Sequence, residues 1–161
     1  MSVTKLVTAK DLLALGSDAM FELIEGELVD VSPSEHYSSE LSLNLVLILG
    51  EFVRTHRLRR ISGENGGFLL SRDPDTVVAP DIGFVRLEKA PQRLPRGQFV
   101  PFAPDLAIEI MSKSNTYPEM DRKARLYLDA GTSLVWVVDP EQEMVIVYRS
   151  GEGPITLRGD D

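Results

Sequence analysis

Three short stretches in the second half of the chain decide the fold: APDIGFV (79–85), APDLAIEIMSKS (103–114) and DRKARLYLDAG (121–131). In the first two stretches, apolar residues alternate with small or polar ones, which predicts two β-strands. In the third, apolar residues recur at helical spacing, which predicts a helix that ends before Gly131. The frame of the chain is therefore an acid on each of two strands, followed by a lysine on a helix.

The middle stretch places a carboxylate inside an otherwise apolar strand. Strand side chains alternate, so Leu106, Ile108 and Ile110 share one face, and Glu109 lies on the other. An unpaired charge in such a strand would cost several kcal/mol. Glu109 must therefore be neutralised by a metal ion, a basic side chain or a proton, and the residues alone leave these three alternatives open.

These stretches resemble the PD-(D/E)xK nuclease superfamily, and specifically its Uma-type restriction endonuclease family, formerly a domain of unknown function. Pro80-Asp81 is similar to the first half of the superfamily motif, and Glu109 is similar to the acid of the second half. The lysine that usually follows this acid two positions later is absent, because that position is Met111. The match to the superfamily motif is therefore incomplete at its lysine.

The Uma-type pattern has its lysine on the following helix instead, in a K-x-x-x-Y-x-x-x-G arrangement that Lys123, Tyr127 and Gly131 fit. Further segments resemble the family's conserved blocks, and these are FELIEGEL (21–28) and VWVVDP (135–140). The resemblance covers roughly residues 10–149. One departure is Ser112-Lys113-Ser114, where the family commonly has S-P-S.

The resemblance implies a nuclease site with Asp81, Glu109 and Lys123 as catalytic residues. The two carboxylates, with the main-chain carbonyl of Ile110, would bind Mg²⁺ or Mn²⁺, which prefer oxygen ligands. Such a metal lowers the pKa of a bound water, and the lysine orients that water and offsets the charge on the phosphate. Lys113, four residues after Glu109, is the alternative lysine. Lys123 is preferred because a helix fixes geometry better than a flexible connection does.

Two further groups of polar residues need an interpretation. His36 and Glu40 lie four residues apart on one face of the helix expected over residues 34–57. The resemblance implies that both are candidate contributors to the site, and the alternative for His36 is a surface or capping group. Glu22 and Glu27 lie on the hairpin that FELIEGEL predicts. As edge-strand charges, Glu22 and Glu27 are expected to be solvated, and the alternative is that a glutamate this early in the chain approaches a metal site.

Composition bounds the class of protein. The chain has 161 residues, 43% hydrophobic and 26% charged, which predicts one globular domain over residues 1–161, with a core of about 10–149 and a tail of 150–161. Cysteine is absent, which excludes thiolate zinc sites and a cysteine nucleophile. The two histidines are too few for a histidine-rich zinc site. Both lie in or near one helix, which argues against a Ser-His-Asp hydrolase site. No apolar run is long enough to span a bilayer, so we expect a cytoplasmic protein without membrane contact.

Net charge opposes the nuclease interpretation, because nucleic-acid binding depends largely on neutralising phosphates. The formal charge is −8. Two basic stretches soften this objection, and they are Arg54, His56, Arg57, Arg59 and Arg60, followed by Arg86, Lys89, Arg93 and Arg96. Each stretch is interpreted either as a phosphate-binding surface or as ordinary solvated surface.

The periodicity along the chain predicts an α/β fold with a mixed central sheet flanked by helices. The resemblance implies that this fold is of restriction-endonuclease-like type. Helices are expected over 8–16, 34–57 and 118–131, and strands over 21–32, 61–71, 76–85, 106–111, 134–138 and 144–148, with a proline-rich loop over 87–104. The buried face of the second helix is expected to consist of Leu41, Leu45, Ile48, Leu49 and Phe52.

The expected function is metal-dependent hydrolysis of DNA phosphodiester bonds by a homodimer, since duplex cleavage needs two cuts. The alternative is a catalytically silent member of the fold that acts as a binding or assembly module. In that alternative, Lys123 pairs with Asp81 and Glu109 as a plain salt bridge. The acidic net charge and the missing lysine at Met111 favour the alternative, and the ordered set of motifs favours the nuclease.

Overall fold

The computed structural model of the chain describes residues 6–16, 20–31, 36–64, 66–90 and 96–159. Its elements are α1 (Ala9–Ala14), β1 (Phe21–Ile24), β2 (Glu27–Asp30), α2 (His36–Thr55), β3 (Arg59–Ser62), β4 (Phe68–Ser71), β5 (Thr76–Val78), β6 (Ile82–Arg86), β7 (Leu106–Ile110), α3 (Tyr117–Asp129), β8 (Leu134–Asp139), β9 (Met144–Arg149) and β10 (Ile155–Arg158). None of the helices in these ranges combines the length and the apolar character that crossing a membrane requires.

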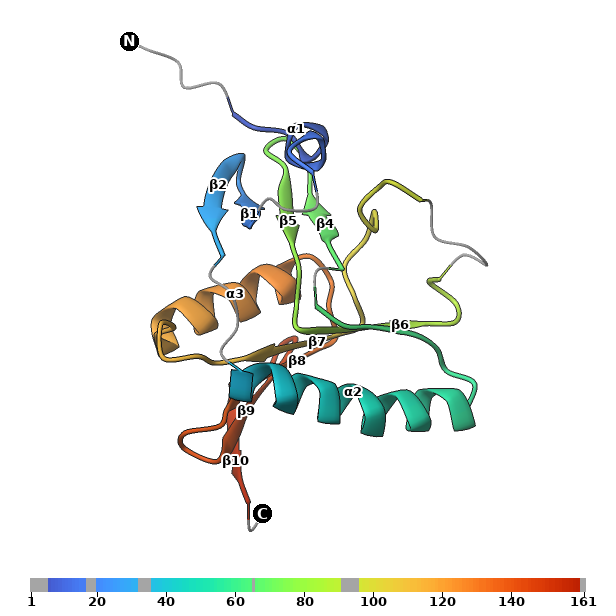
Figure 1. Cartoon of the computed structure of the whole chain (residues 1–161), viewed down its shortest axis with the longest axis vertical. Coiled ribbons are helices and arrows are strands. Elements are labelled where there is room, and N and C mark those ends of the chain that lie inside the picture. Colours follow the sequence, from blue (N-terminus) through green and yellow to red (C-terminus); the bar gives the residue numbers. More distant parts are fainter. Residues whose placement is uncertain (1–5, 17–19, 32–35, 65, 91–95, 160–161) are drawn as a thin grey trace.

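A six-stranded mixed sheet separates the two long helices, α2 and α3 (Figure 1). Its strand order is β10-β9-β8-β7-β6-β3. The neighbours β7 and β8 are parallel, and α3 connects them because parallel strands need a crossover. The other neighbours in this sheet are antiparallel. The predicted α/β class, with a mixed sheet flanked by helices, is confirmed.

The strand expected over residues 76–85 is divided between two sheets. β5 ends at Val78 in a second sheet, which has four strands in the order β2-β1-β5-β4. β6 begins at Ile82 in the six-stranded sheet, so the prediction of one strand is wrong. Pro80 lies in the connection and has no amide hydrogen for a ladder. Asp81 therefore lies where the chain passes from one sheet to the other.

The segment over residues 61–71 is divided in the same way. β3 joins the large sheet and β4 joins the small one. The chain comes close to a neighbouring ring at one glycine of this segment, because a Cβ added to Gly67 would lie 2.5 Å from the Phe99 ring. The same holds at Gly83, where an added Cβ would lie 2.8 Å from the Phe68 ring.

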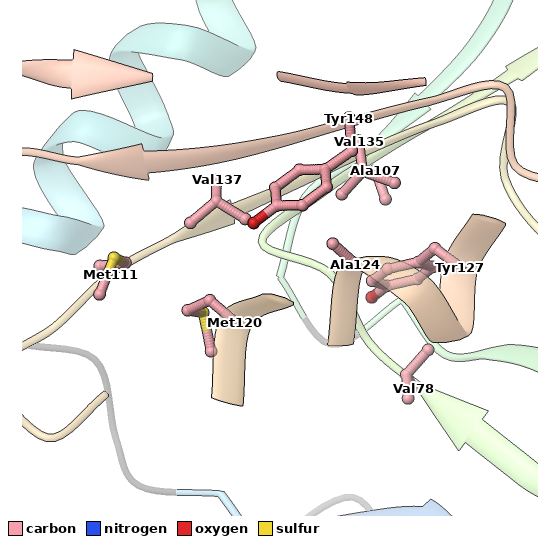
Figure 2. Packing of buried hydrophobic residues seen from close by; sticks show 9 residues of the cluster. All are labelled: Val78, Ala107, Met111, Met120, Ala124, Tyr127, Val135, Val137 and Tyr148. Carbon is pink, nitrogen blue, oxygen red and sulfur yellow. The ribbon is translucent and has the colours of Figure 1, made fainter. Parts of the chain in front are cut away.

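α3 begins and ends close to the predicted positions. The backbone amide and the hydroxyl of Thr116 both donate to Glu119 Oε2 at 2.8 Å, which fixes the first turn. Gly131 follows the helix with a φ of 94°, a conformation that glycine adopts without strain. The buried side of α3 packs on the large sheet, and Figure 2 shows this cluster, which comprises Val78, Ala107, Met111, Met120, Ala124, Tyr127, Val135, Val137 and Tyr148.

α2 turns a different side inward from the one expected. Ser38, Ser42 and Val53 are its buried residues, whereas Ile48 and Phe52 are exposed. The expected buried face is therefore wrong for Ile48 and Phe52. Hydrophobic periodicity identifies an apolar stripe on a helix, but it does not say what covers that stripe.

Candidate active site

The structure brings Asp81, Glu109 and Lys123 together, as the sequence predicts. β6 and β7 are antiparallel neighbours, and Asp81 Oδ2 accepts a hydrogen bond from the backbone amide of Ile110 at 2.6 Å. The Nζ atom of Lys123, on α3, lies 3.0 Å from Glu109 Oε2. The residue that precedes β6, the strand β7 and the helix α3 thus place two carboxylates and one ammonium at one point.

Glu22 is a fourth member of this cluster, and the expectation that it is solvated is wrong. Its Oε1 atom lies 3.0 Å from Lys123 Nζ and accepts a hydrogen bond from the Ala79 amide at 2.8 Å. β1 pairs with β2 on one side and with β5 on the other, so it is not an edge strand. Because Leu23 is fully buried, the two-residue period of β1 turns Glu22 to the opposite face, toward α3.

Glu109 is buried, and its two oxygens have different partners. Oε2 accepts from Lys123, and Oε1 accepts from the hydroxyl of Tyr127 at 2.7 Å. Burial raises the pKa of Glu109 to about 7, and the negative charges of Glu22 and Asp81 add to the rise. Lys123 and the Tyr127 hydroxyl lower it in part. Without a metal ion, Glu109 therefore exchanges a proton near neutral pH.

The two other charged groups of the cluster also have shifted pKa values. Burial works to lower the pKa of Lys123, but Glu109 and Glu22 outweigh it, and the net pKa is raised. Lys123 is therefore protonated throughout the physiological range. Burial raises the pKa of Asp81, and the hydrogen bond from the Ile110 amide opposes that rise.

The cluster lies in a groove of about 660 Å³, which we call the acidic groove. The carboxylates that line it belong to Glu22, Glu25, Glu27, Asp30, Asp81, Glu109 and Glu119, and its basic residues are Arg122 and Lys123. Carboxylates outnumber basic groups in this lining. The acidic groove therefore attracts cations and repels a phosphate backbone until cations neutralise it.

The remaining predicted contributors lie outside the acidic groove. His36 and Glu40 are exposed on α2 and are not part of its lining, although Ser38 of the same helix is. Lys113 is exposed on the turn after β7 and is not part of the lining either. Lys123 is thus the lysine that contacts the acids.

The oxygen donors at the cluster fit a hard divalent cation. Asp81, Glu109 and Ile110 all line the acidic groove. Two carboxylates and one main-chain carbonyl would leave coordination positions for water, which Mg²⁺ retains. Among the residues that the structure describes, no three or more His, Cys, Asp or Glu side chains are grouped so that they could hold a metal ion. A metal here would therefore depend on two carboxylates, the carbonyl and water.

Comparison with known proteins identifies the family of the chain and agrees with this fold. Residues 9–159 match the Uma2 family, described as "Putative restriction endonuclease", and the chain belongs to this family. The crystal structure of "a putative nuclease belonging to DUF820 from Anabaena variabilis ATCC 29413" is similar, with a TM-score of 0.77 and 22% sequence identity. The similarity covers 96% of this chain and 86% of that chain, and it confirms the restriction-endonuclease-like fold. No curated protein matches the chain.

The raised pKa of Glu109 predicts a pH-dependent stability of the metal-free protein. Glu109 has a pKa of about 7 when folded, against 4.5 for the ordinary side chain. Between these values the folded protein holds a proton that the unfolded chain releases, so this contribution to stability is complete below pH 4.5 and is lost as pH rises toward 7. The loss amounts to at most about 3 kcal/mol. Urea unfolding of the wild type and of Glu109→Gln across this range should give steeper pH dependence for the wild type, and equal slopes would contradict the assignment.

The hydroxyl of Tyr127 predicts a second measurable effect. Replacing Tyr127 with phenylalanine keeps the ring in its fully buried position but removes the donor to Glu109. A hydrogen bond to a charged group contributes about 1.5–3 kcal/mol, so we expect lower stability at pH 8, where Glu109 is ionised, and a smaller loss at pH 5. The matched control is Tyr148→Phe, which alters another buried tyrosine that does not contact Glu109 and should show no such pH dependence. Equal losses at both pH values for Tyr127→Phe would refute the role given to its hydroxyl.

Proposed function

We propose that the protein is a metal-dependent endonuclease that hydrolyses DNA phosphodiester bonds. The observation that carries the proposal is the convergence of Asp81, Glu109 and Lys123 on the acidic groove, in a chain of this family. Asp81, Glu109 and the carbonyl of Ile110 would hold Mg²⁺ or Mn²⁺. The bound metal would supply an activated water and neutralise charge that develops on the phosphate.

The residues of the chain would then have separate roles. Lys123 cannot serve as a base while its pKa is raised, so it would orient the attacking water and balance charge on the phosphate. Glu22 and Glu109 hold its Nζ atom at 3.0 Å on either side, which fixes its position before substrate binds. Tyr127 would hold Glu109 in place through Oε1. Each of these contacts limits the motion of a reacting group.

Binding of DNA would use the basic stretches outside the acidic groove. In the antiparallel pairing of β3 with β6, Arg59 is the backbone partner of Arg86, so these members of the two stretches come together at one edge of the large sheet. Arg93 lies outside the described residues. Such an edge suits sequence-independent contacts to phosphates. A cytoplasmic homodimer, with one cut made by each copy, completes the proposal.

The alternative function is a silent nuclease fold that binds or assembles without cutting. Its support is the ion pairing of Lys123 with both Glu22 and Glu109, which gives these two buried acids a cation without a metal. Calorimetric titration with Mg²⁺ and Mn²⁺ distinguishes the two functions. The nuclease should bind metal more tightly at pH 8 than at pH 6, because binding displaces the proton of Glu109. No binding at either pH would favour the silent fold, and binding that Asp81→Asn leaves unchanged would place the metal elsewhere.

A further inference from the structure

Lys123 lies between two acids that come from different sheets. Glu22 belongs to β1 of the small sheet, and Glu109 belongs to β7 of the large sheet. The helix α3, which carries Lys123, lies between the two sheets (Figure 1). The Nζ atom of Lys123 lies 3.0 Å from Glu22 Oε1 and 3.0 Å from Glu109 Oε2. One cation is therefore shared by two acids, of which Glu109 alone belongs to the metal site of the proposed function.

The oxygen of Glu109 that contacts Lys123 is the one that faces the acidic groove. Lys123 lines the groove, whereas Tyr127, the partner of Oε1, is fully buried and is not part of the lining. A cation that enters from the groove would therefore meet Oε2. An ammonium and a divalent cation on one buried oxygen repel each other strongly, because little water screens them. The ion pair of Lys123 with Glu109 therefore opposes metal binding.

Glu22 offers Lys123 a second acceptor that is held in place. Its Oε1 atom also accepts a hydrogen bond from the Ala79 amide at 2.8 Å, and its side chain is only 10% exposed. Ala79 lies two residues before Asp81, so the same oxygen is tied to the segment that carries the other proposed metal ligand. Within the described ranges, no three His, Cys, Asp or Glu side chains are grouped so that they could hold a metal. This arrangement pairs Glu22 with Lys123 and leaves the metal to the other two acids.

We propose that Glu22 is a positioning residue that retains Lys123 when Glu109 binds the metal. This inference rests on the metal site of the proposed function. An ammonium has three N–H donors. When Lys123 leaves Glu109, one donor stays with Glu22, and the others become available to the attacking water and the phosphate. Glu22 thus makes it easier to separate Lys123 from Glu109, and it keeps the ammonium at the site.

A double-mutant cycle tests this role by calorimetric titration of Mg²⁺ at pH 8. Glu22→Gln should raise the metal dissociation constant roughly tenfold, because Lys123 loses Glu22 and competes with the metal for Glu109. Lys123→Met should lower the constant, because the competing cation is gone. The factor caused by Glu22→Gln should be several times smaller when Lys123 is already methionine, since Glu22 acts through Lys123.

The matched control for the cycle is Glu27→Gln. It removes one carboxylate charge from the same groove, but from an exposed position on β2, and it should alter the constant less than Glu22→Gln does. Lys123→Gln, which keeps a donor without the charge, takes the place of Lys123→Met if the methionine variant does not fold. Equal factors for Glu22→Gln with and without Lys123 would mean that Glu22 binds the metal itself or acts by its charge alone, and this result would overturn the proposal.

A spectroscopic measurement tests the retention of Lys123 directly. The ammonium signal of Lys123 in heteronuclear NMR should persist in the Mg²⁺-loaded wild type, because Glu22 still protects it from exchange with water. In Mg²⁺-loaded Glu22→Gln, the signal should broaden or vanish. Loss of the signal in the loaded wild type would contradict the role given to Glu22.

None of these readouts depends on cleavage, so the inference and the nuclease can fail separately. Metal binding that shows the coupling of Glu22 with Lys123, without any cutting, would refute the nuclease and leave the inference standing. Cutting without that coupling would do the reverse. A wild type that binds no metal would overturn both.

Discussion

Replacing Asp81 with asparagine is expected to reduce DNA cleavage by about a hundred- to a thousandfold while the protein still folds. Asp81 Oδ2 accepts a hydrogen bond from the Ile110 amide at 2.6 Å, and an asparagine oxygen can accept the same bond. The variant loses the negative charge that a divalent cation needs. The rate of nicking of supercoiled plasmid measures the loss, and circular dichroism checks the fold.

The matched control for this change is Asp30→Asn. Asp30 also lines the acidic groove but is exposed at the end of β2, so the variant removes the same charge away from the cluster. It should cut at a rate within a fewfold of the wild type. Equal losses in both variants would mean that Asp81 matters only through the overall charge of the groove, and full activity of Asp81→Asn would remove it from the site.

Replacing Lys123 with methionine is expected to destabilise the metal-free protein by about 3–5 kcal/mol at pH 8, because it leaves two buried acids without their cation. The exposed fractions of the side chains are 17% for Lys123, 10% for Glu22 and 8% for Glu109, so water screens this cluster little. Methionine keeps much of the length and apolar volume of the lysine stem. The free energy of unfolding from urea titration measures the effect.

The control for Lys123→Met is Arg125→Met on the same helix. Arg125 pairs with Asp121 through an exposed ion pair, with Nε 2.8 Å from Oδ2, so its loss should change stability little. The penalty for Lys123→Met should also shrink at pH 5, where a proton can neutralise Glu109. A penalty as small as that of Arg125→Met, or one independent of pH, would contradict the buried ion-pair cluster.

The sequence predicts those parts of the site that local patterns define. Asp81, Glu109 and Lys123 follow a motif order, and the positions of a strand end, a strand interior and a helix are local properties. Glu22 could not be placed in the same way. The burial of Glu22 depends on the pairing of β1 with β5, which lies about fifty residues further along the chain. The local sequence of the β1–β2 hairpin carries no information about this third strand.

The fold shows the same limit. Alternation of apolar residues predicts extended chain over 76–85, but the division between two sheets at Pro80 is a tertiary property. On α2, the strongest apolar stripe includes the exposed Ile48 and Phe52, while the chain buries Ser38 and Ser42. Small side chains let the helix approach its neighbours closely, and periodicity analysis scores them as polar. The fold class and the approximate positions of the helices and strands are therefore predictable from the sequence, whereas the side of each element that becomes buried is not.

Nicking of supercoiled DNA by the purified wild type, with Mg²⁺ or Mn²⁺ and with chelator, is the most direct test of the central claim. Asp81→Asn, prepared in the same way, serves as the reference for contaminating nucleases. The account predicts cutting that requires metal and that is nearly lost in Asp81→Asn. Folded wild type that does not cut with either metal, or cutting that Asp81→Asn shares equally, would contradict the nuclease assignment.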